Sequence, residues 1–472
     1  MHCKGFYLLQ YFRINDPYRL IGLLAILLLI QLPLFIDTPE LTFPELKSFI
    51  VGEKVHEGSS LYTGIVDSVG PLSGWFDGLI HLCFGRSLLA RHIIAFLLIF
   101  VQAAYLGMIF SNQKAFAEGT YIPSLIYGIA CCFSFDTLSL TPELLGAGAL
   151  LPALNNLFKE IEFREQHSES IFGLGLHISL ASLFCFSYSI YLIGSIITLA
   201  IFTRSTLRKY ILLIIGFTLP HLMLICIYYL KDGLSELWQY YYAPNLGFQS
   251  VSYMQSQSMW ILLALPLTFL VISLFMMNRQ ARLSKYQTQL AQAMFFWMIF
   301  SFIQVIFSKD FRPQNFITIF PGLAFFITHC LLILPNRRFG SMAVWVFLLG
   351  TVMMSYLTRY GVVESVQYEG LQVPQSSTHS GKRLLVLDEA WGIYKDNQLA
   401  SPFLNWNLSK VVFSQPEYYD NIIKVYEGLR ADPPEIIRDK NDLLKPFMDR
   451  LPELKQAYTR KGMYYVKRTA NN

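Results

Sequence analysis

The sequence predicts an all-α polytopic membrane protein with a small extracytoplasmic α/β domain at its C-terminus. Of its 472 residues, 54% are hydrophobic and only 15% are charged, which lies outside the range of soluble domains. Many apolar runs approach the ~20 residues that a helix needs to cross ~30 Å of hydrocarbon. The composition becomes polar after Gly361, where the apolar runs stop.

The apolar runs predict about eleven transmembrane helices. The first run lacks a small-residue cleavage site and is too long for a signal peptide, so we expect it to stay as an anchor. The predicted spans cover, in order, residues 20–36, 92–110, 117–135, 142–158, 170–186, 188–202, 210–230, 258–277, 291–307, 316–334 and 341–356. Residues 71–85 are apolar but too short to span, which predicts an interfacial or re-entrant helix.

The cationic residues predict which turns face the cytoplasm. Lys and Arg gather in alternate turns, whereas the turns around Leu138 and Ser187 carry neither. The turns assigned to the cytoplasm hold Lys4, Arg13, Arg19, Lys114, Lys159, Arg164, Arg204, Arg208, Lys209, Arg279, Arg282, Lys285, Arg337 and Arg338. Lys4, Arg13 and Arg19 thus place the N-terminus in the cytoplasm, and an odd number of spans then places the C-terminus outside. The formal charge of +5 forms no basic stripe, so we expect no nucleic-acid partner.

We expect a transmembrane domain over residues 1–360, with a first extracytoplasmic loop at residues 37–91, and a periplasmic domain over residues 361–472. In the latter, Leu384 to Asp388 has the pattern of a buried strand, and Glu417 to Arg430 has helical spacing. Gly462 to Lys467 has the pattern of a last strand. The C-terminal part is therefore predicted to be a small α/β domain.

The first extracytoplasmic loop concentrates polar residues at the membrane edge. Glu40 and Glu45 follow the first predicted span, and each is preceded by a proline that can open a short helix. Two interpretations stay open: an acid that caps a helix or is solvated, and a general base that faces a membrane-embedded site. His56, taken alone, is interpreted as structural. Together with Tyr62 and Asp67 it completes the loop's candidates for substrate binding.

Two further turns on the same predicted side carry charge. Asp136 and Glu143 flank the turn around Leu138, where Thr-Pro-Glu is also a helix-start signal. Lys309 and Arg312 lie in the turn after the predicted span 291–307 and have the chemistry to bind a phosphate or pyrophosphate. The alternative for Arg312 is a salt bridge to Asp310, with ordinary interfacial placement of the side chain.

These motifs resemble the GT-C superfamily of membrane glycosyltransferases, in particular bacterial members of the protein-mannosyltransferase and aminoarabinose-transferase type. The resemblance starts with a first span followed by an acid-bearing loop, continues in a late charged turn before a span with Pro321, and ends in a small terminal domain. Its residues are Glu45-Leu-Lys, Glu57-Gly58, Leu61-Tyr62, Gly70-Pro71-Leu72, Ser308 to Arg312, Gly392-Ile-Tyr394, Pro433 to Ile437 with Asp439, and Tyr464-Tyr465.

The resemblance implies transfer of a sugar, with inversion, from a polyprenyl-phosphate donor to a hydroxyl of an extracytoplasmic lipid, glycan or protein. Glu45 is the leading candidate for the base and Glu40 the second. Asp67, Asp136 and Glu143 would support sugar or acceptor hydroxyls. Lys309 and Arg312 would hold the lipid phosphate.

The same resemblance implies a bacterial inner-membrane location with the C-terminal domain in the periplasm. Some relatives use a divalent metal, but this sequence has no decisive ligand cluster, so we predict no obligatory metal and no other cofactor.

Two other classes of function compete with a glycosyltransferase. A transporter of lipid-linked substrates would place charged groups inside its spans, which are almost free of them here. A non-catalytic scaffold of the cell envelope would use the terminal domain for docking, and composition does not exclude it. A nucleotide-sugar mechanism is disfavoured, because no Gly-rich phosphate-binding loop is present.

Overall fold

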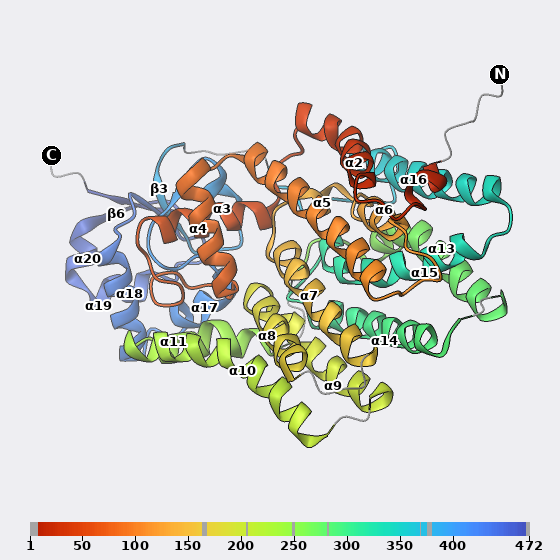
Figure 1. Ribbon diagram of the computed structural model, residues 1–472. Coiled ribbons are helices and arrows are strands. Elements are labelled where there is room, and N and C mark those ends of the chain that lie inside the picture. Colours follow the sequence, from red (N-terminus) through yellow and green to blue (C-terminus); the bar gives the residue numbers. More distant parts are fainter. Residues whose placement is uncertain are drawn as a thin grey trace. The chain divides into compact units, whose positions relative to one another are not determined.

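Helices make up most of the chain (Figure 1). The structure is a computed structural model that describes residues 8–162, 168–203, 206–247, 251–280, 283–368, 370–374 and 380–468. Four cationic residues used to predict the topology, Lys4, Arg164, Arg204 and Arg282, lie outside these ranges.

The chain divides into two compact units. The first contains residues 1–39, 87–224 and 247–371, and the second contains residues 40–86, 225–246 and 372–472. The first-loop segment 40–86 and the C-terminal part thus belong to one unit. The predicted boundary at residue 360 concerns the side of the membrane rather than contacts, and it stays a prediction.

The first unit is a helical bundle. It contains α1 (Leu8–Phe12), α2 (Arg19–Ile36), α5 (Leu88–Asn112), α6 (Ile122–Ala130), α7 (Pro142–Glu162), α8 (Ser168–Phe184), α9 (Ile190–Phe202), most of α10 (Leu207–Leu230), α13 (Ser256–Gln280), α14 (Lys285–Phe307), α15 (Phe320–Ile333) and α16 (Arg337–Arg359). Short 3₁₀ helices cover Phe135–Leu138, Phe186–Ser189 and Pro313–Ile319, and two-residue strands, β1 (Val251–Ser252) and β2 (Asp310–Phe311), pair in parallel.

Seven helices in the described part of the chain are long and apolar enough to cross a membrane. They are Arg19–Ile36, Leu88–Asn112, Leu207–Leu230, Ser256–Gln280, Lys285–Phe307, Pro313–Ile333 and Arg338–Arg359. Each coincides with a predicted span. The predicted all-α membrane architecture is therefore confirmed.

The other four predicted spans do not meet the same criteria, and three of them are helical over most of their length. α8 and the segment Phe186–Phe202 are shorter apolar helices, and α7 is long enough but less apolar. The prediction of one continuous helix over residues 117–135 is wrong, because α6 covers only Ile122–Ala130. The chain leaves this helix in a turn and then forms the 3₁₀ helix Phe135–Leu138, which sets up a polar turn.

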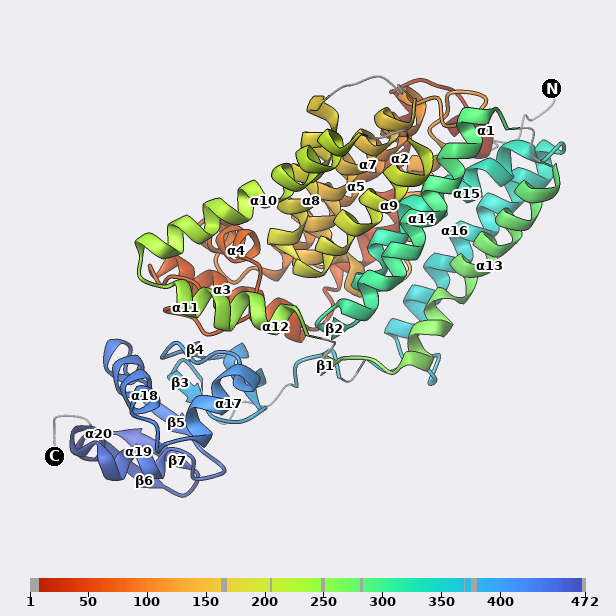
Figure 2. The same cartoon turned by 90° about the horizontal axis from the view of Figure 1, so that it is seen from below.

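Helix α15 lies at the core of the first unit. The window Pro313–Ile333 is 89% buried, far more than any other candidate span. It packs against α13 and α6, and α13, α14, α15 and α16 run side by side in Figure 2. A helix that is apolar on all sides is stable only when other helices surround it. This packing fixes the position of the polar turn that precedes α15.

The second unit combines the first loop with an α/β part. Its helices are α3 (Phe43–His56), α4 (Pro71–Phe84), α11 (Leu234–Leu237), α12 (Ala243–Asn245), α17 (Trp406–Ser414), α18 (Tyr419–Ala431), α19 (Lys445–Arg450) and α20 (Pro452–Ala457). Its strands are β3 (Arg383–Val386), β4 (Gln398–Leu399), β5 (Ile436–Arg438), β6 (Tyr458–Lys461) and β7 (Tyr464–Lys467).

The strands form one sheet in the order β4-β3-β5-β7-β6. β3 pairs in parallel with β4 and β5, whereas β7 is antiparallel to β5 and β6. Strand β3, helix α18 and strand β7 confirm the α/β pattern predicted for the C-terminal part. The predicted short helix after Gly70 is confirmed as α4.

One ion pair and several hydrogen bonds join the first-loop segment to the α/β part within the second unit. The Arg86 guanidinium contacts Glu53 at 2.5 Å and donates to the carbonyl oxygens of Tyr394 and Asn397. The Lys54 ammonium lies 2.7 Å from the Asp432 carboxylate. Residues far apart in the sequence are therefore held together by charged contacts.

Candidate functional site

Two polar turns meet in the first unit. One turn runs from Ser308, where α14 ends, through β2 to the 3₁₀ helix Pro313–Ile319. The other joins the 3₁₀ helix Phe135–Leu138 to α7, whose first residue is Pro142. Proline suits the first turn of a helix, because the N–H it lacks has no helical partner there. The local sequence thus ends α14 at one turn and begins α7 at the other, and the packing of the bundle brings the two turns together.

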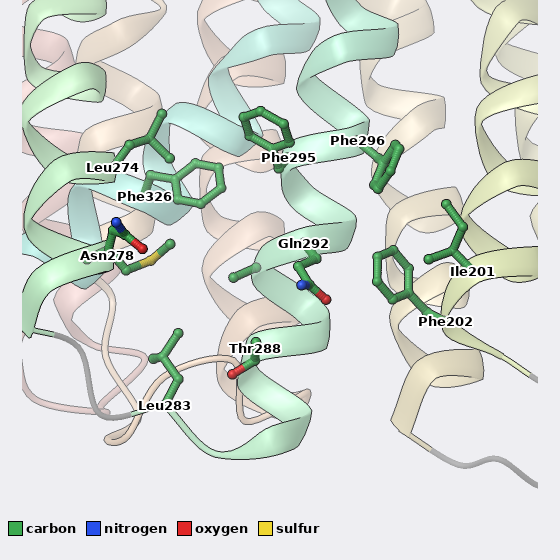
Figure 3. Close-up of a pocket in the computed structure, with 12 residues that line it drawn as sticks. Ile201, Phe202, Leu274, Asn278, Leu283, Thr288, Gln292, Phe295, Phe296 and Phe326 are labelled. Atoms are coloured by element: carbon green, nitrogen blue, oxygen red, sulfur yellow. The ribbon is translucent and has the colours of Figure 1, made fainter.

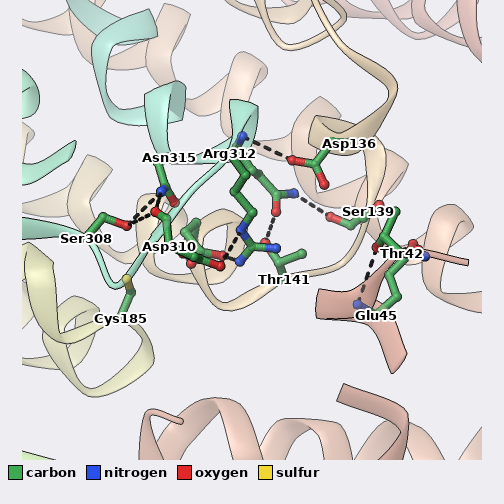
Figure 4. Close-up of polar contacts among 12 residues, drawn as sticks. Thr42, Glu45, Asp136, Ser139, Thr141, Cys185, Ser308, Asp310, Arg312 and Asn315 are labelled. Atoms are coloured by element: carbon green, nitrogen blue, oxygen red, sulfur yellow. Dashed lines mark hydrogen bonds and ion pairs between the residues drawn. The ribbon is translucent and has the colours of Figure 1, made fainter. Parts of the chain in front are cut away.

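Arg312 is the centre of this contact (Figure 4). Its side chain is only 3% exposed. Its Nη2 donates to Glu143 Oε2 at 2.5 Å, and its Nε lies 3.1 Å from Asp310 Oδ2. In the described part of the chain its Nη1 is buried and has no hydrogen-bond partner. Arg312 therefore bridges the two turns, and its Nη1 is available to donate a further hydrogen bond.

The surrounding carboxylates keep Arg312 charged. Burial alone lowers the pKa of the guanidinium, but Asp310, Glu143 and Asp136 together reverse this effect and raise the pKa well above its ordinary value. Three carboxylates face one guanidinium, so the cluster is anionic overall when all of these groups are ionised. Such a cluster attracts cations and repels free anions. Its carboxylates can also accept hydrogen bonds from hydroxyl groups.

Gln314 joins the two turns, and Asn315 braces the turn to which it belongs. The Gln314 backbone N–H donates to Asp136 Oδ2 at 3.2 Å, and the Gln314 side chain donates to the Ser139 carbonyl oxygen at 2.8 Å. The Thr141 hydroxyl donates to Gln314 Oε1. The Asn315 side chain donates to the Ser308 hydroxyl at 2.6 Å.

Sequence reasoning missed Gln314 and Asn315 as site residues. Both are fully buried, next to the charged turn. The sequence did carry a signal for them: two adjacent amides lie between a charged turn and an apolar span, where polar side chains need hydrogen-bond partners.

Lys309 has a different environment from Arg312. It is partly buried, its ammonium lies 3.4 Å from the Gly247 carbonyl oxygen, and burial lowers its pKa. No ion pair of Lys309 occurs within the described ranges. Of the two predicted phosphate-binding residues, Lys309 is thus the one whose charge is not neutralised by carboxylates.

The first-loop acids lie in the second unit. Glu45 is buried, and its Oε2 accepts hydrogen bonds from the Thr42 hydroxyl at 2.8 Å and the Thr42 N–H at 3.1 Å. The Thr42 hydroxyl accepts a bond from the Glu45 N–H in return, which is a capping box at the start of α3 (Figure 4). The capping role foreseen for these acids therefore applies to Glu45, whereas Glu40 is exposed and precedes the helix.

Tyr62 and Asp67 lie in a buried part of the same loop. Asp67 is 2.8 Å from the Lys47 ammonium and accepts hydrogen bonds from the Val69 N–H and the Asn405 side chain. The Tyr62 hydroxyl donates to the Val69 carbonyl oxygen at 2.7 Å, and burial raises its pKa well above the ordinary value. Both side chains hold the loop in shape.

His56 is exposed at the end of α3, and its ring centre lies 5.5 Å from that of His81. Within each unit, the structure thus brings together Asp136, Glu143 and Arg312 in the first and Tyr62 and Asp67 in the second. Among the described residues, no group of three or more His, Cys, Asp or Glu side chains is arranged to hold a metal ion.

The fold is similar to that of two crystal structures. ArnT from Cupriavidus metallidurans in the apo state matches with a TM-score of 0.54 and 13% identity, over 95% of this chain and 98% of that one. The oligosaccharyltransferase from Archaeoglobus fulgidus in the apo form matches with a TM-score of 0.50 and 10% identity, over 96% of this chain and 75% of that one. No protein-family model and no curated protein sequence matches the chain. Both structures have the GT-C fold, so the resemblance drawn from the sequence is confirmed at the level of fold.

Proposed function

We propose that this chain is a membrane glycosyltransferase that moves a sugar from a polyprenyl-phosphate donor to the hydroxyl of an extracytoplasmic acceptor, with inversion at the anomeric carbon. The observation that carries the proposal is the polar contact of Arg312, Glu143 and Asp136 in a chain with the GT-C fold. An oligosaccharyltransferase with this fold moves a sugar chain, which supports the same class of reaction here.

The contact can supply binding groups for a sugar. The cluster contains the carboxylates of Glu143, Asp310 and Asp136 next to the Arg312 guanidinium. A carboxylate oxygen can accept a hydrogen bond from a sugar hydroxyl, and the guanidinium can donate one to the hydroxyl oxygen. Burial strengthens such bonds, because the local dielectric constant is low. In the proposed reaction, these groups orient the sugar or the acceptor hydroxyl.

Lys309 is the first candidate to hold the leaving phosphate. Its ammonium is not paired with a carboxylate in the described part of the chain, and a cation next to the bridging oxygen stabilises the charge that develops as the glycosidic bond breaks. Arg312 Nη1, which is surrounded by carboxylates, is instead proposed to donate to a sugar or acceptor hydroxyl. The lipid phosphate leaves with the bonding electrons, and the acceptor oxygen forms the new bond to the anomeric carbon.

A first-loop carboxylate is proposed as the base that takes the acceptor proton. Glu45 is the residue that the family resemblance favours, but its Oε2 already accepts two bonds from Thr42. Glu40 is exposed and carries no helix cap. Both residues are kept as candidates for the base.

Transfer of radiolabelled sugar from polyprenyl-phosphate donors by the purified protein in nanodiscs tests the proposal. We expect turnover by the wild type and a loss of about 100-fold or more in the variant that lacks the base, since general-base catalysis contributes roughly 10²–10⁴-fold. Glu40→Gln and Glu45→Gln are compared, with Glu417→Gln, an exposed carboxylate of the C-terminal part, as control.

Full turnover in both first-loop variants would reject a carboxylate base in this loop. Absence of turnover with every donor, together with capture of an envelope protein by the C-terminal part, would instead favour the scaffold interpretation. Loss of turnover in one variant, with donor binding retained, would identify the base.

A further inference from the structure

A pocket of about 520 Å³ opens between α9, α13, α14 and α15 in the first unit (Figure 3). This volume lies within the roughly 300–1,000 Å³ of pockets that bind small molecules. It lies close to the C-terminal end of α13 and the N-terminal end of α14. Arg279 and Lys285 lie at these two ends, beside the turn that the sequence assigns to the cytoplasm. The proposed transfer reaction uses the other ends of these helices, so this pocket is not part of it.

The position and lining of the pocket favour a hydrocarbon chain. Most lining side chains are apolar, and they include Phe202, Phe296 and Phe326. At its edges, Ile201 and Phe295 are 55% and 48% exposed on helices of the membrane bundle. What surrounds such helices in a bilayer is lipid, so an apolar pocket that opens at their surface is filled by hydrocarbon rather than by water.

Part of the pocket lining is polar and carries amide N–H groups that can donate hydrogen bonds. Asn278 and Gln292 line it, and neither amide has a hydrogen-bond partner in the part of the chain that the structure describes. Figure 3 shows both amides beside the apolar lining. Both side chains are exposed, so their N–H groups are accessible to the ester or phosphate oxygens of a lipid.

The charge beside this polar part of the lining favours an anion. Lys285 is the first residue of α14, and residues 285, 288, 292 and 295 recur every three or four positions, so they share one face of the helix. The lining residues include no charged side chain of either sign, so the positive charge comes from Lys285, beside the pocket, and no carboxylate of the lining opposes it. Basic pockets between transmembrane helices on the cytoplasmic side are typical sites for anionic lipid headgroups.

We propose that this pocket binds one acyl chain of an anionic phospholipid. Its phosphate lies near the Lys285 ammonium, and the amides of Asn278 and Gln292 donate hydrogen bonds to its ester or phosphate oxygens. The chain occupies the apolar part beside Phe296 and Phe326. The proposal is independent of the transfer reaction, because it concerns different residues.

Native mass spectrometry of the full-length protein tests the proposal. After delipidation, phosphatidylglycerol or phosphatidylethanolamine is added, and the bound lipids are counted. We expect Gln292→Trp, which fills the pocket from an exposed helix position, to bind one phosphatidylglycerol fewer than the wild type. Gln289→Trp, the same change on the same helix away from the pocket, should bind as many as the wild type.

The headgroup is tested with Lys285→Gln. A lysine near the membrane surface contributes roughly 1 kcal/mol to the binding of an anionic lipid, which corresponds to an affinity for phosphatidylglycerol that is about fivefold weaker in the variant. Lys114→Gln, an exposed lysine of another turn assigned to the cytoplasm, serves as control and should leave the affinity unchanged.

A phosphatidylglycerol with a photoreactive tail provides a test without any variant. We expect the crosslink to fall on peptides that contain residues 274–296. Equal binding of both phospholipids by the wild type, an unchanged count in Gln292→Trp, or displacement of the lipid only by a polyprenyl phosphate would each overturn the proposal.

Discussion

At the scale of single residues, Arg312 decides how the polar turns of the first unit are held. The sequence left open whether it binds phosphate or pairs with Asp310. In the structure it contacts both Asp310 and Glu143 and is almost fully buried. A buried ion pair is weak evidence of stability, but removing one partner is costly, because the other charge stays buried.

Replacement of Arg312 should therefore destabilise the protein. We expect Arg312→Leu to lower the free energy of unfolding by about 3–5 kcal/mol, since it strands the carboxylates of Glu143 and Asp310. Thermal unfolding of the purified protein in detergent measures the effect. Lys455→Leu removes an exposed ion pair with Asp449 and should change the unfolding temperature little. Equal effects of the two substitutions would contradict the assigned role of Arg312.

Glu45 has two properties that mutation can separate: its oxygen accepts the hydrogen bonds of the capping box of α3, and its carboxylate carries a negative charge. Thr42→Ala removes the side chain that caps the helix and should cost about 0.5–2 kcal/mol. Glu45→Gln keeps an oxygen that accepts the bonds from Thr42, so it should leave the helix start intact while it removes the charge. Hydrogen exchange of the backbone amides of residues 43–48 distinguishes the two variants. Faster exchange in Glu45→Gln than in Thr42→Ala would show that the charge itself holds the helix start.

At the scale of helices, α8 and α10 approach closely at two glycines. A Cβ atom at Gly175 would meet the Leu213 carbonyl oxygen, and one at Gly216 would meet the Phe172 carbonyl oxygen. Small residues at such crossings let the helix backbones pack directly against each other, as is common between membrane helices.

Alanine at Gly175 should therefore force the helices apart. We expect Gly175→Ala to lower the stability by about 1–3 kcal/mol, as overpacking does. Gly148→Ala makes the same chemical change in α7, but the new methyl group would lie 3.0 Å from the Gln102 amide nitrogen and would touch no backbone atom. Gln102 is held by hydrogen bonds to Leu144 and Tyr127, so we expect this variant to lose a little stability, but less than Gly175→Ala. The difference in unfolding temperature between the two variants removes the gain in helix propensity that they share, which is about 1 kcal/mol. A Gly175→Ala variant as stable as Gly148→Ala would refute the close crossing.

At the scale of the whole molecule, the second unit joins three distant parts of the sequence. Asp432 connects two of them. It pairs with Lys54 of the first loop at 2.7 Å, with Arg383 at the start of β3, and accepts a bond from the Ser401 N–H at 3.0 Å. Lys54 is buried, and its charge is compensated by Asp432 and by Glu57, whose carboxylate lies 2.9 Å away.

Loss of the Asp432 carboxylate should loosen the first loop. We expect Asp432→Ala to speed hydrogen exchange both in residues 43–57 and around residue 401, because two segments lose the same partner. Asp449→Ala, which breaks only an exposed pair with Lys455, should leave exchange in these segments unchanged. An effect of Asp432→Ala that is confined to the C-terminal part would show that the first loop is held by other contacts.

The sequence alone determined the membrane class, seven of the spans and the α/β character of the C-terminal part. These features follow from hydropathy and periodicity, which are local properties of the chain. It also predicted that Asp136, Glu143, Lys309 and Arg312 belong to polar turns, because charges beside apolar spans are costly unless they are paired, solvated or used.

Only the tertiary structure decided which of these charges meet. Arg312 lies 169 positions from Glu143, and nothing local distinguishes that partner from other carboxylates. The failure of the predicted span 117–135 has the same origin, since the helix covers only Ile122–Ala130 and the rest of the segment forms turns and a 3₁₀ helix. Hydropathy records how strongly a segment avoids water, but whether lipid or protein covers it depends on packing between distant segments.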